Sequence, residues 1–418
     1  MKPNKTLIRS VIALMLAISM TLSLSSCTLV YDMLEQMLFG DEYGDQDVDP
    51  TPDENGGNDD QKIPEINVDD SGSGFLPGSG ENDISAINPA KKAMLSVVSI
   101  IAKTQTGVSY ASGVFCSVDK NTGDAYIITN YHVIYDNGYA SAIKVYLYGM
   151  HLETYAISAT IVGGSLTNDI ALLKVTGSDV IKNSYATAAT FADSDSVRIF
   201  DRVYAIGNSE AKGLSVTEGI VSVESESTTV SGADGSTITL RVMRTDAPVN
   251  HGNSGGGLFD SQGRLIGIVT AKEISSDIEN MGYAIPSNLV LALVNNILRN
   301  CEGSSNMNVL KPLMGITITS YVSGLVVDPE SGDFYEANLV EIIEVSKTSP
   351  AYGMAKVGDV IEYIIVDGRR TEVYRSYQVT DSMFYASSGS EIRLGVLRNG
   401  EPIELIMTIT PDAVTVVK

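Results

Sequence analysis

Short apolar runs rich in β-branched residues recur along the chain from about residue 84, and turn-forming residues separate them. Nine such runs, without long helical periodicity between them, predict a mainly β fold, either a sandwich or a pair of barrels. Two segments favour helix instead: a short turn after Pro89, and a closing helix over residues 287–298 with Leu289, Leu293 and Ile297 on one face. The predicted strands are residues 96–101, 112–118, 125–130, 143–148, 170–175, 202–206, 219–223, 237–243 and 265–270.

The first thirty residues have the pattern of an export signal. Three basic residues precede an apolar run over residues 11–22, which is too short for a comfortable transmembrane helix. The letters LSSC at 24–27 resemble the cleavage box of bacterial lipoproteins. The resemblance implies that residues 1–26 are a lipoprotein signal peptide and that Cys27 is lipidated, with the two or more acyl chains that stable anchoring needs. The alternatives are an ordinary signal peptide with an incidental Cys27, or an uncleaved membrane anchor over residues 7–24.

Most of the negative charge lies in one segment ahead of the predicted strands. The formal net charge is −23, and residues 31–83 hold sixteen acidic residues against one basic residue. The segment is rich in Gly, Asn, Pro and Ser, so it cannot bury enough apolar surface to offset the entropy lost on ordering. We therefore predict that residues 27–83 are a disordered, self-repelling tether.

Composition also excludes several classes of protein. The acid excess argues against a nucleic-acid binder, because a phosphate backbone needs a basic surface. Three cysteines are too few for a disulfide scaffold, and three histidines without paired spacing argue against a zinc site. Cys116 and Cys301 are either paired or, as the lack of a spacing motif favours, two buried free thiols.

Three local patterns carry candidate chemistry. His132 follows an apolar strand directly, Asp169 opens another, and Ser254 lies in the glycine-rich run 252–257. A serine hydroxyl is a weak nucleophile that needs an adjacent base, an imidazole can take its proton near neutral pH, and a carboxylate can orient the imidazole. The order His, Asp, Ser in an all-β chain matches the chymotrypsin-type arrangement.

The surrounding residues resemble the trypsin-like serine proteases of the HtrA/Deg family. The matching letters are TDAPVNHGNSGGGL at 245–258, SGV at 112–114, AIGN at 205–208, TEGIVS at 217–222 and GYAIP at 282–286. The resemblance covers roughly residues 90–300. It implies a protease domain over residues 84–301 with a chymotrypsin-like fold, in which two six-stranded β-barrels hold the active site between them.

The resemblance also assigns roles to individual residues. It implies that His132 is the general base, Asp169 the carboxylate that orients it, and Ser254 the nucleophile of peptide-bond hydrolysis, with no metal or organic cofactor. The backbone N–H groups of Gly252, Asn253 and Ser254 are the candidates for the oxyanion hole, with Gly252 and Ser254 as the main pair.

Substrate contacts are expected on both sides of the nucleophile. The family usually has proline where this chain has His251, at the rim of the substrate pocket, so we hypothesise that His251 contacts substrate. The alternative is an exposed histidine without a role; an unchanged pH profile and substrate preference in His251→Ala would support that alternative. The resemblance implies a preference for small or medium apolar residues. The strand expected to line the pocket contributes Ile268, Val269, Thr270 and Ala271.

The last hundred residues resemble a bacterial PDZ domain of α+β fold. Residues 302–312 are a predicted polar linker, and the matches within 313–418 are LMGI at 313–316, TSPA at 348–351, VGDVI at 357–361 and VDG at 366–368. PDZ domains bind a peptide C-terminus as an added strand, with backbone N–H groups capturing the carboxylate. The alternative is a docking or spacer domain without a free groove. The implied carboxylate-binding loop is Leu313, Met314, Gly315 and Ile316.

These patterns together predict a lipid-anchored serine endopeptidase of the bacterial cell envelope, outside the cytoplasm. Its expected partners are partly unfolded or damaged polypeptides, peptide C-termini and the membrane, with no nucleic acid, and the family resemblance suggests a homotrimer. The alternative from another class is a peptide-binding or chaperone-like lipoprotein whose His132, Asp169 and Ser254 are idle.

Overall fold

The computed structural model describes residues 89–150, 152–270, 281–327, 332 and 334–417. The predicted signal peptide, Cys27 and the acidic tether lie outside the described residues, as do His151, Ala271 and the loop 272–280. Within the described ranges, no helix is long and apolar enough to cross a membrane. The fold is mainly β, as predicted, and every one of the nine predicted runs overlaps a strand.

The N-terminal sheet has seven strands and begins after a short helix. That helix is α2 (Pro89–Ala93), continued by η2 (Met94–Ser96). The strands are β1 (Val97–Lys103), β2 (Val108–Asp119), β3 (Asp124–Thr129), β4 (Ala142–Leu147), β5 (Ile157–Ser158), β6 (Thr160–Ser165) and β7 (Ile170–Val175). Three helical turns lie between or after them: α3 (Tyr131–Ile134), η3 (Glu153–Tyr155) and α4 (Asp179–Lys182).

This first sheet curls, but its hydrogen-bonded ladder does not close. The strand order is β5-β4-β1-β2-β3-β7-β6. β5 and β6 form opposite edges although Ala159 alone separates them in the chain, so the two edges approach at that corner. The expected closed six-stranded barrel is therefore replaced by a seven-stranded open sheet, in which no pairing joins the edge strands β5 and β6 among the described residues.

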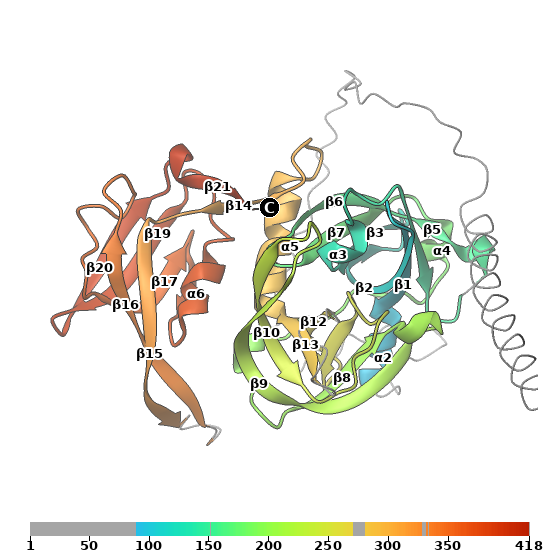
Figure 1. The fold of residues 1–418 in the computed structure, drawn as a ribbon, viewed down its shortest axis with the longest axis horizontal. Helices are drawn as coiled ribbons and strands as arrows, with labels where there is room; N and C mark the ends of the chain where they lie inside the picture. Colours follow the sequence, from blue (N-terminus) through green and yellow to red (C-terminus); the bar gives the residue numbers. More distant parts are fainter. Residues whose placement is uncertain (1–88, 151, 271–280, 328–331, 333, 418) are drawn as a thin grey trace, which may run out of the picture. The chain divides into compact units, whose positions relative to one another are not determined.

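The second sheet is the closed six-stranded barrel that was expected (Figure 1). Its strand order is β10-β13-β12-β11-β8-β9. The strands are β8 (Arg202–Gly207), β9 (Ser215–Ser231), β10 (Thr237–Thr245), β11 (Gly257–Asp260), β12 (Leu265–Thr270) and β13 (Gly282–Pro286), with the turns η4 (Ser194–Ser196) and η5 (Ser209–Ala211).

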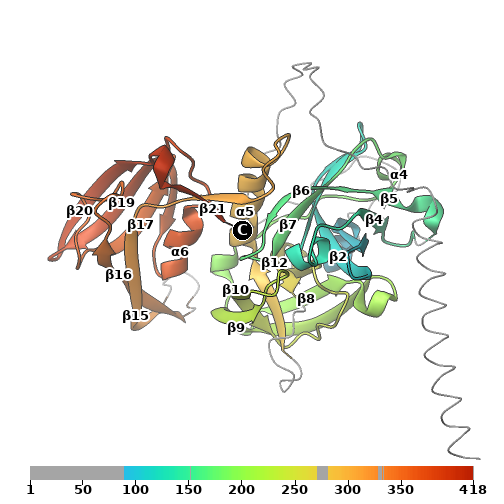
Figure 2. The same ribbon diagram turned by 45° about the horizontal axis from the view of Figure 1, so that its top comes forward.

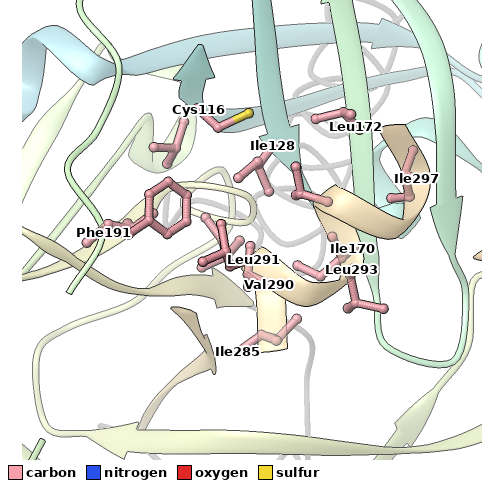
Figure 3. Close-up of a cluster of buried hydrophobic side chains, with 14 of the residues drawn as sticks. Cys116, Ile128, Ile170, Leu172, Phe191, Ile285, Val290, Leu291, Leu293 and Ile297 are labelled. Carbon is pink, nitrogen blue, oxygen red and sulfur yellow. The ribbon is translucent and has the colours of Figure 1, made fainter. Parts of the chain in front are cut away.

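Helix α5 (Ser287–Asn300) follows the barrel and joins the cores of the two sheets. Leu289, Leu293 and Ile297 are buried, as the sequence pattern predicted. Figure 3 shows side chains of α5 among Ile128 and Ile170 of the first sheet and Ile285 of the barrel. This shared cluster fixes the two sheets against one another, because its apolar area is removed from water only when both are in place.

The two described cysteines are buried free thiols. Burial raises the pKa of both side chains, that of Cys301 to about 11 and that of Cys116 further. Of the two states that the sequence left open, the structure has the unpaired one.

The C-terminal sheet has the strand order β15-β16-β17-β19-β20, with β18 paired to β17. Helix α6 contacts β15, β17 and β18 on one face of this sheet (Figure 2). The elements are β15 (Ile316–Val327), β16 (Phe334–Val345), β17 (Val360–Val366), β18 (Arg369–Glu372), α6 (Ser376–Ser382), β19 (Glu391–Arg398), β20 (Glu401–Thr408) and η6 (Pro411–Ala413).

The end of the predicted linker is a strand. β14 (Val309–Pro312) pairs antiparallel with β21 (Val414–Val417), and Val309 is buried in the cluster around α5. The side-chain amide of Asn296 on α5 donates to the carbonyl of Leu310 (2.7 Å) and to that of Phe384 (2.8 Å). The expectation of a polar linker is therefore wrong for residues 309–312, because their pairing partner lies at the other end of this region of the sequence.

A buried ion pair holds the C-terminal sheet together. The Asp359 carboxylate, 1% exposed, accepts from Arg398 Nε and Nη2 at 2.7 Å each and from the Lys356 N–H at 2.9 Å. Burial works to raise the pKa of Asp359, but the bonds from Arg398 and Lys356 outweigh it and hold that pKa below its usual range. The Asp359 carboxylate is therefore ionised at neutral pH in the folded protein.

We predict that Asp359→Asn lowers the free energy of unfolding by about 1.5–3 kcal/mol at pH 7, since it removes two charge-assisted hydrogen bonds from Arg398, whose side chain is 20% exposed and keeps part of its hydration. Because the folded pKa is below the unfolded value of about 3.9, the stabilisation is complete above that pH and is lost as the pH falls through the folded pKa. Urea unfolding from pH 7 to pH 3 measures both effects. Asp179→Asn, in the exposed pair with Lys182, is the control and should change stability by less than about 1 kcal/mol; equal effects of the two variants at pH 7 would contradict the prediction.

Candidate active site

His132 lies on the helical turn α3, which follows strand β3. Its Nδ1 lies 2.9 Å from Asp169 Oδ2 and 3.0 Å from Oδ1, and its backbone N–H donates to Oδ1 at 3.1 Å. The side chain is 23% exposed, so one edge of the ring reaches solvent while the other is held by the carboxylate. This contact favours the tautomer with the proton on Nδ1, which leaves Nε2 as an acceptor.

Asp169 lies at the entrance of β7 in a left-handed backbone conformation (φ 53°) and is 1% exposed. Two residues hold it there. The Asn130 side-chain amide donates to its carbonyl (2.9 Å), and the Thr270 hydroxyl donates to Oδ2 (3.2 Å). Asn130 therefore holds the Asp169 backbone, and Thr270 supplies a hydrogen bond that a buried carboxylate oxygen requires.

Ser254 lies in a turn between β10 and β11 that only glycines allow. Gly252 and Gly255 have positive φ values of 92° and 80°. A Cβ on Gly255 would come within 2.2 Å of the Ser112 carbonyl oxygen and 2.3 Å of Thr129 Oγ1. The turn therefore packs directly against the first sheet, which is why the sequence has glycine around the serine.

Strand β12 links the Ser254 turn to Asp169, through hydrogen bonds at two of its consecutive residues. The Gly255 N–H donates to the Val269 carbonyl (2.9 Å), and the Val269 N–H donates to the Gly256 carbonyl (2.8 Å). The next residue along β12 is Thr270, whose hydroxyl bonds to Asp169. The structure therefore pairs His132 with Asp169 and connects the Ser254 turn to the same carboxylate through β12.

The backbone donors near Ser254 are not equivalent. The Asn253 N–H donates to the Asn250 carbonyl (3.0 Å), so it is engaged within the turn. The Asn253 carbonyl accepts from the Gly256 N–H (2.9 Å), and the Ser254 N–H, in the same rigid peptide plane, points the opposite way. Of the three expected oxyanion donors, the Asn253 N–H is therefore the one that donates within its own turn.

The expected substrate-contacting residues are found in different surroundings. His251 is exposed in the turn before Ser254. The Ile268 and Val269 side chains are buried in hydrophobic clusters, and Thr270 places its hydroxyl on Asp169. Neither the Thr270 contact nor the Asn130 contact was foreseen; the one available signal was that Asn130 lies two residues before His132.

The expected carboxylate-binding loop precedes an edge strand. β15 is the terminal strand of its sheet, and Gly315 before it has a φ of 76°. The Met314 carbonyl accepts from the Ala351 N–H (3.1 Å) and the Gly315 carbonyl from the Ser346 N–H (2.8 Å). Because each peptide unit is planar and trans, the N–H groups of Gly315 and Ile316 point away from these two acceptors.

Comparison with known proteins agrees with this geometry. Residues 111–268 match the trypsin-like peptidase domain family. The serine protease Do-like HtrA of Lactobacillus helveticus is 30% identical over 308 residues, which cover 71% of this chain and 68% of that protein. This chain belongs to the HtrA family of trypsin-like serine proteases.

Other members of the family give similar matches. The serine protease Do-like HtrA of Bacillus subtilis (strain 168) is 32% identical over 68% of this chain, and the periplasmic serine endoprotease DegP of Escherichia coli (strain K12) is 33% identical over 72%. The match spans 60% of the length of the Bacillus relative. A solved HtrA-type protease, AlgW with a tripeptide, has a TM-score of 0.50 and 27% identity, over 77% of this chain and 96% of that one.

Proposed function

We propose that this HtrA-family chain is a serine endopeptidase in which Ser254, His132 and Asp169 form the catalytic triad. The observation that carries the proposal is the bidentate approach of His132 Nδ1 to the buried Asp169 carboxylate, at 2.9 and 3.0 Å. The Ser254 turn is tied to the same carboxylate through β12. No metal or organic cofactor enters the reaction.

The chemistry is acyl transfer in two halves. Ser254 Oγ attacks the carbonyl carbon of the scissile bond while His132 Nε2 takes its proton, and the carbonyl oxygen becomes an oxyanion bound by the N–H groups of Gly252 and Ser254. The C–N bond then breaks, and His132 returns the proton to the leaving amine. Water attacks the resulting ester in the same way, His132 again taking and returning the proton, and releases the acid and Ser254. Asp169 stays ionised and stabilises the imidazolium.

The proposed substrates are partly unfolded or damaged polypeptides of the cell envelope, because such chains can present an extended segment to the site. The relatives DegP and DegQ of Escherichia coli are named periplasmic proteases. A location outside the cytoplasm agrees with the export signal in this sequence. The exposed position of His251, three residues before Ser254, fits the hypothesis that it contacts substrate at the pocket rim.

We also propose that the C-terminal sheet is a PDZ domain that binds peptide C-termini. A bound peptide would extend the sheet at the free edge of β15, next to α6, and its carboxylate would meet the N–H groups of Gly315 and Ile316. Main-chain pairing supplies affinity that does not depend on sequence, which suits a protease that acts on many chains.

Ser254→Ala should abolish hydrolysis of fluorescein-labelled casein, with a loss in kcat on the order of 10⁶, and should abolish labelling by a fluorophosphonate. Both are measured on the full chain, with and without an added C-terminal peptide. Ser261→Ala, at an exposed serine in the turn after β11, is the matched control and should keep full activity. A wild-type chain that neither cuts casein nor reacts with the probe under either condition would leave the peptide-binding lipoprotein with an idle triad as the better description.

Gly315→Ala should weaken binding of a C-terminal peptide about tenfold or more. The new Cβ would lie 2.0 Å from the Cβ of Ser349, and an L side chain is strained at a φ of 76°. Fluorescence anisotropy with a labelled peptide measures the Kd. Gly353→Ala has the same kind of positive φ (82°) but no atom within 4 Å of the added Cβ, so it controls for backbone strain. Equal Kd values for Gly315→Ala and wild type would argue for a docking domain instead.

Cys27 is the proposed site of lipid attachment. Cells grown with radiolabelled palmitate should incorporate the label into the wild-type chain and not into Cys27→Ala, and the variant should leave the membrane fraction or stay as an unprocessed precursor. Cys301→Ala is the control and should remain labelled. Label that persists in Cys27→Ala would contradict lipidation there.

A further inference from the structure

Ser112 on β2 is a hydroxyl buried at the junction of the two sheets. It is 0% exposed, between Ala111 and Gly113. Its Oγ donates to the Gly252 carbonyl (2.7 Å) and accepts from the Asn208 N–H (2.7 Å). The hydroxyl therefore both donates and accepts a hydrogen bond, and both of its partners are main-chain groups of the second sheet.

The backbone of Ser112 makes the neighbouring contacts. Its N–H donates to the Ser254 carbonyl (2.8 Å), and its carbonyl accepts from Thr129 Oγ1 (2.8 Å). One residue of the first sheet therefore holds the carbonyls of Gly252 and Ser254, the two residues whose N–H groups form the proposed oxyanion hole.

The glycines around Ser112 make this contact possible. A Cβ on Gly207 would lie 3.0 Å from Ser112 Oγ, and one on Gly255 would lie 2.2 Å from the Ser112 carbonyl oxygen. Without those side chains, β2, the end of β8 and the Ser254 turn come together backbone to backbone. This close packing holds the Ser112 hydroxyl in one position. Its hydrogen bond to the Gly252 carbonyl therefore favours one conformation of the turn.

Gly252 is the residue of the turn that most needs such selection. Its φ of 92° lies in a region that glycine enters and leaves without a steric penalty, so its local conformation is weakly determined by the chain itself. The Gly252 carbonyl shares a planar peptide unit with the Asn253 N–H, whereas the Gly252 N–H lies in the preceding unit. Holding the carbonyl therefore anchors one side of Gly252 and narrows the pairs of φ and ψ through which its N–H can be directed.

We propose that Ser112 is a positioning residue for the oxyanion hole: its hydroxyl, held by the Asn208 N–H, fixes the Gly252 carbonyl and thereby aims the Gly252 N–H at the oxyanion. This rests on the proposed peptidase activity. Ser112 does not contact substrate in this scheme. It contributes to stabilising the tetrahedral state, in which negative charge develops on the carbonyl oxygen.

The test compares Ser112→Ala and Ser112→Cys in the full chain. The probes are a fluorogenic peptide built on the first casein cleavage site and the matching peptide boronate, which forms a tetrahedral adduct on Ser254. Rates are expressed per active site, counted by fluorophosphonate labelling taken to completion. Ser112→Ala should lower kcat about 10- to 100-fold with KM within about twofold of wild type, less than the loss of about 10²–10³ on removing an oxyanion donor itself.

The inhibition constant for the boronate should rise by a factor similar to the loss in kcat, because both report the tetrahedral state. Ser112→Cys keeps a donor at this position, weaker than the hydroxyl and carried on a larger atom, so its kcat should fall between those of wild type and Ser112→Ala. Ser99→Ala is the matched control. Ser99 is the cross-strand partner of Ser112 on β1 and is 5% exposed, and its removal should leave both constants unchanged.

The outcomes separate the two proposals. If wild type neither hydrolyses casein nor labels, the peptidase proposal fails and this inference fails with it. If wild type is active but both Ser112 variants keep the wild-type kcat and boronate constant per active site, Ser112 only stabilises the fold and the inference alone is overturned. An equal loss in Ser99→Ala would overturn it too, because the effect would not depend on the contact with Gly252.

Discussion

The buried carboxylate of Asp169 is the constraint on which the centre of this protein depends. A charge with 1% exposure is tolerated only where donors surround it, and the donors here are the His132 ring and backbone and the Thr270 hydroxyl. His132 belongs to the first sheet and Thr270 to the second barrel. The carboxylate therefore has all of these donors only when both are assembled, and the same carboxylate holds Nδ1 of the imidazole.

Close backbone contact is the second requirement of the junction. The Ser254 turn approaches β2 and β3 so tightly that a side chain on Gly255 would overlap the Ser112 carbonyl. The buried residues of helix α5 pack against the cores of both sheets and so help to hold the sheets together. Apolar packing thus brings the sheets together, and hydrogen bonds to Ser112 and Asp169 determine their register at the site.

The C-terminal sheet is built on a different plan. In the barrel every strand has two neighbours, whereas β15 lies at an edge beside α6. An edge strand exposes main-chain groups that another chain can pair with. Ile316 and Ile318 of β15 pack against the hydrophobic core of this sheet, while the outer edge of the strand has no neighbouring strand among the described residues.

The sequence by itself determined the strand-rich class, all nine predicted strands, the closing helix and the identity of His132, Asp169 and Ser254 as candidates. These follow from local periodicity and from residue types that chemistry requires. Among the strands that it missed are β6, β11 and β13, in which glycine or proline weakens the alternating pattern, and β14, whose partner is distant.

Tertiary structure alone decided what surrounds the candidates. The open form of the first sheet, the engagement of the Asn253 N–H within its own turn, and the Thr270 and Ser112 contacts all join residues far apart in the chain. No local sequence pattern predicts these contacts, because a hydrogen bond between two sheets forms only when tertiary packing brings the two backbones within reach of each other.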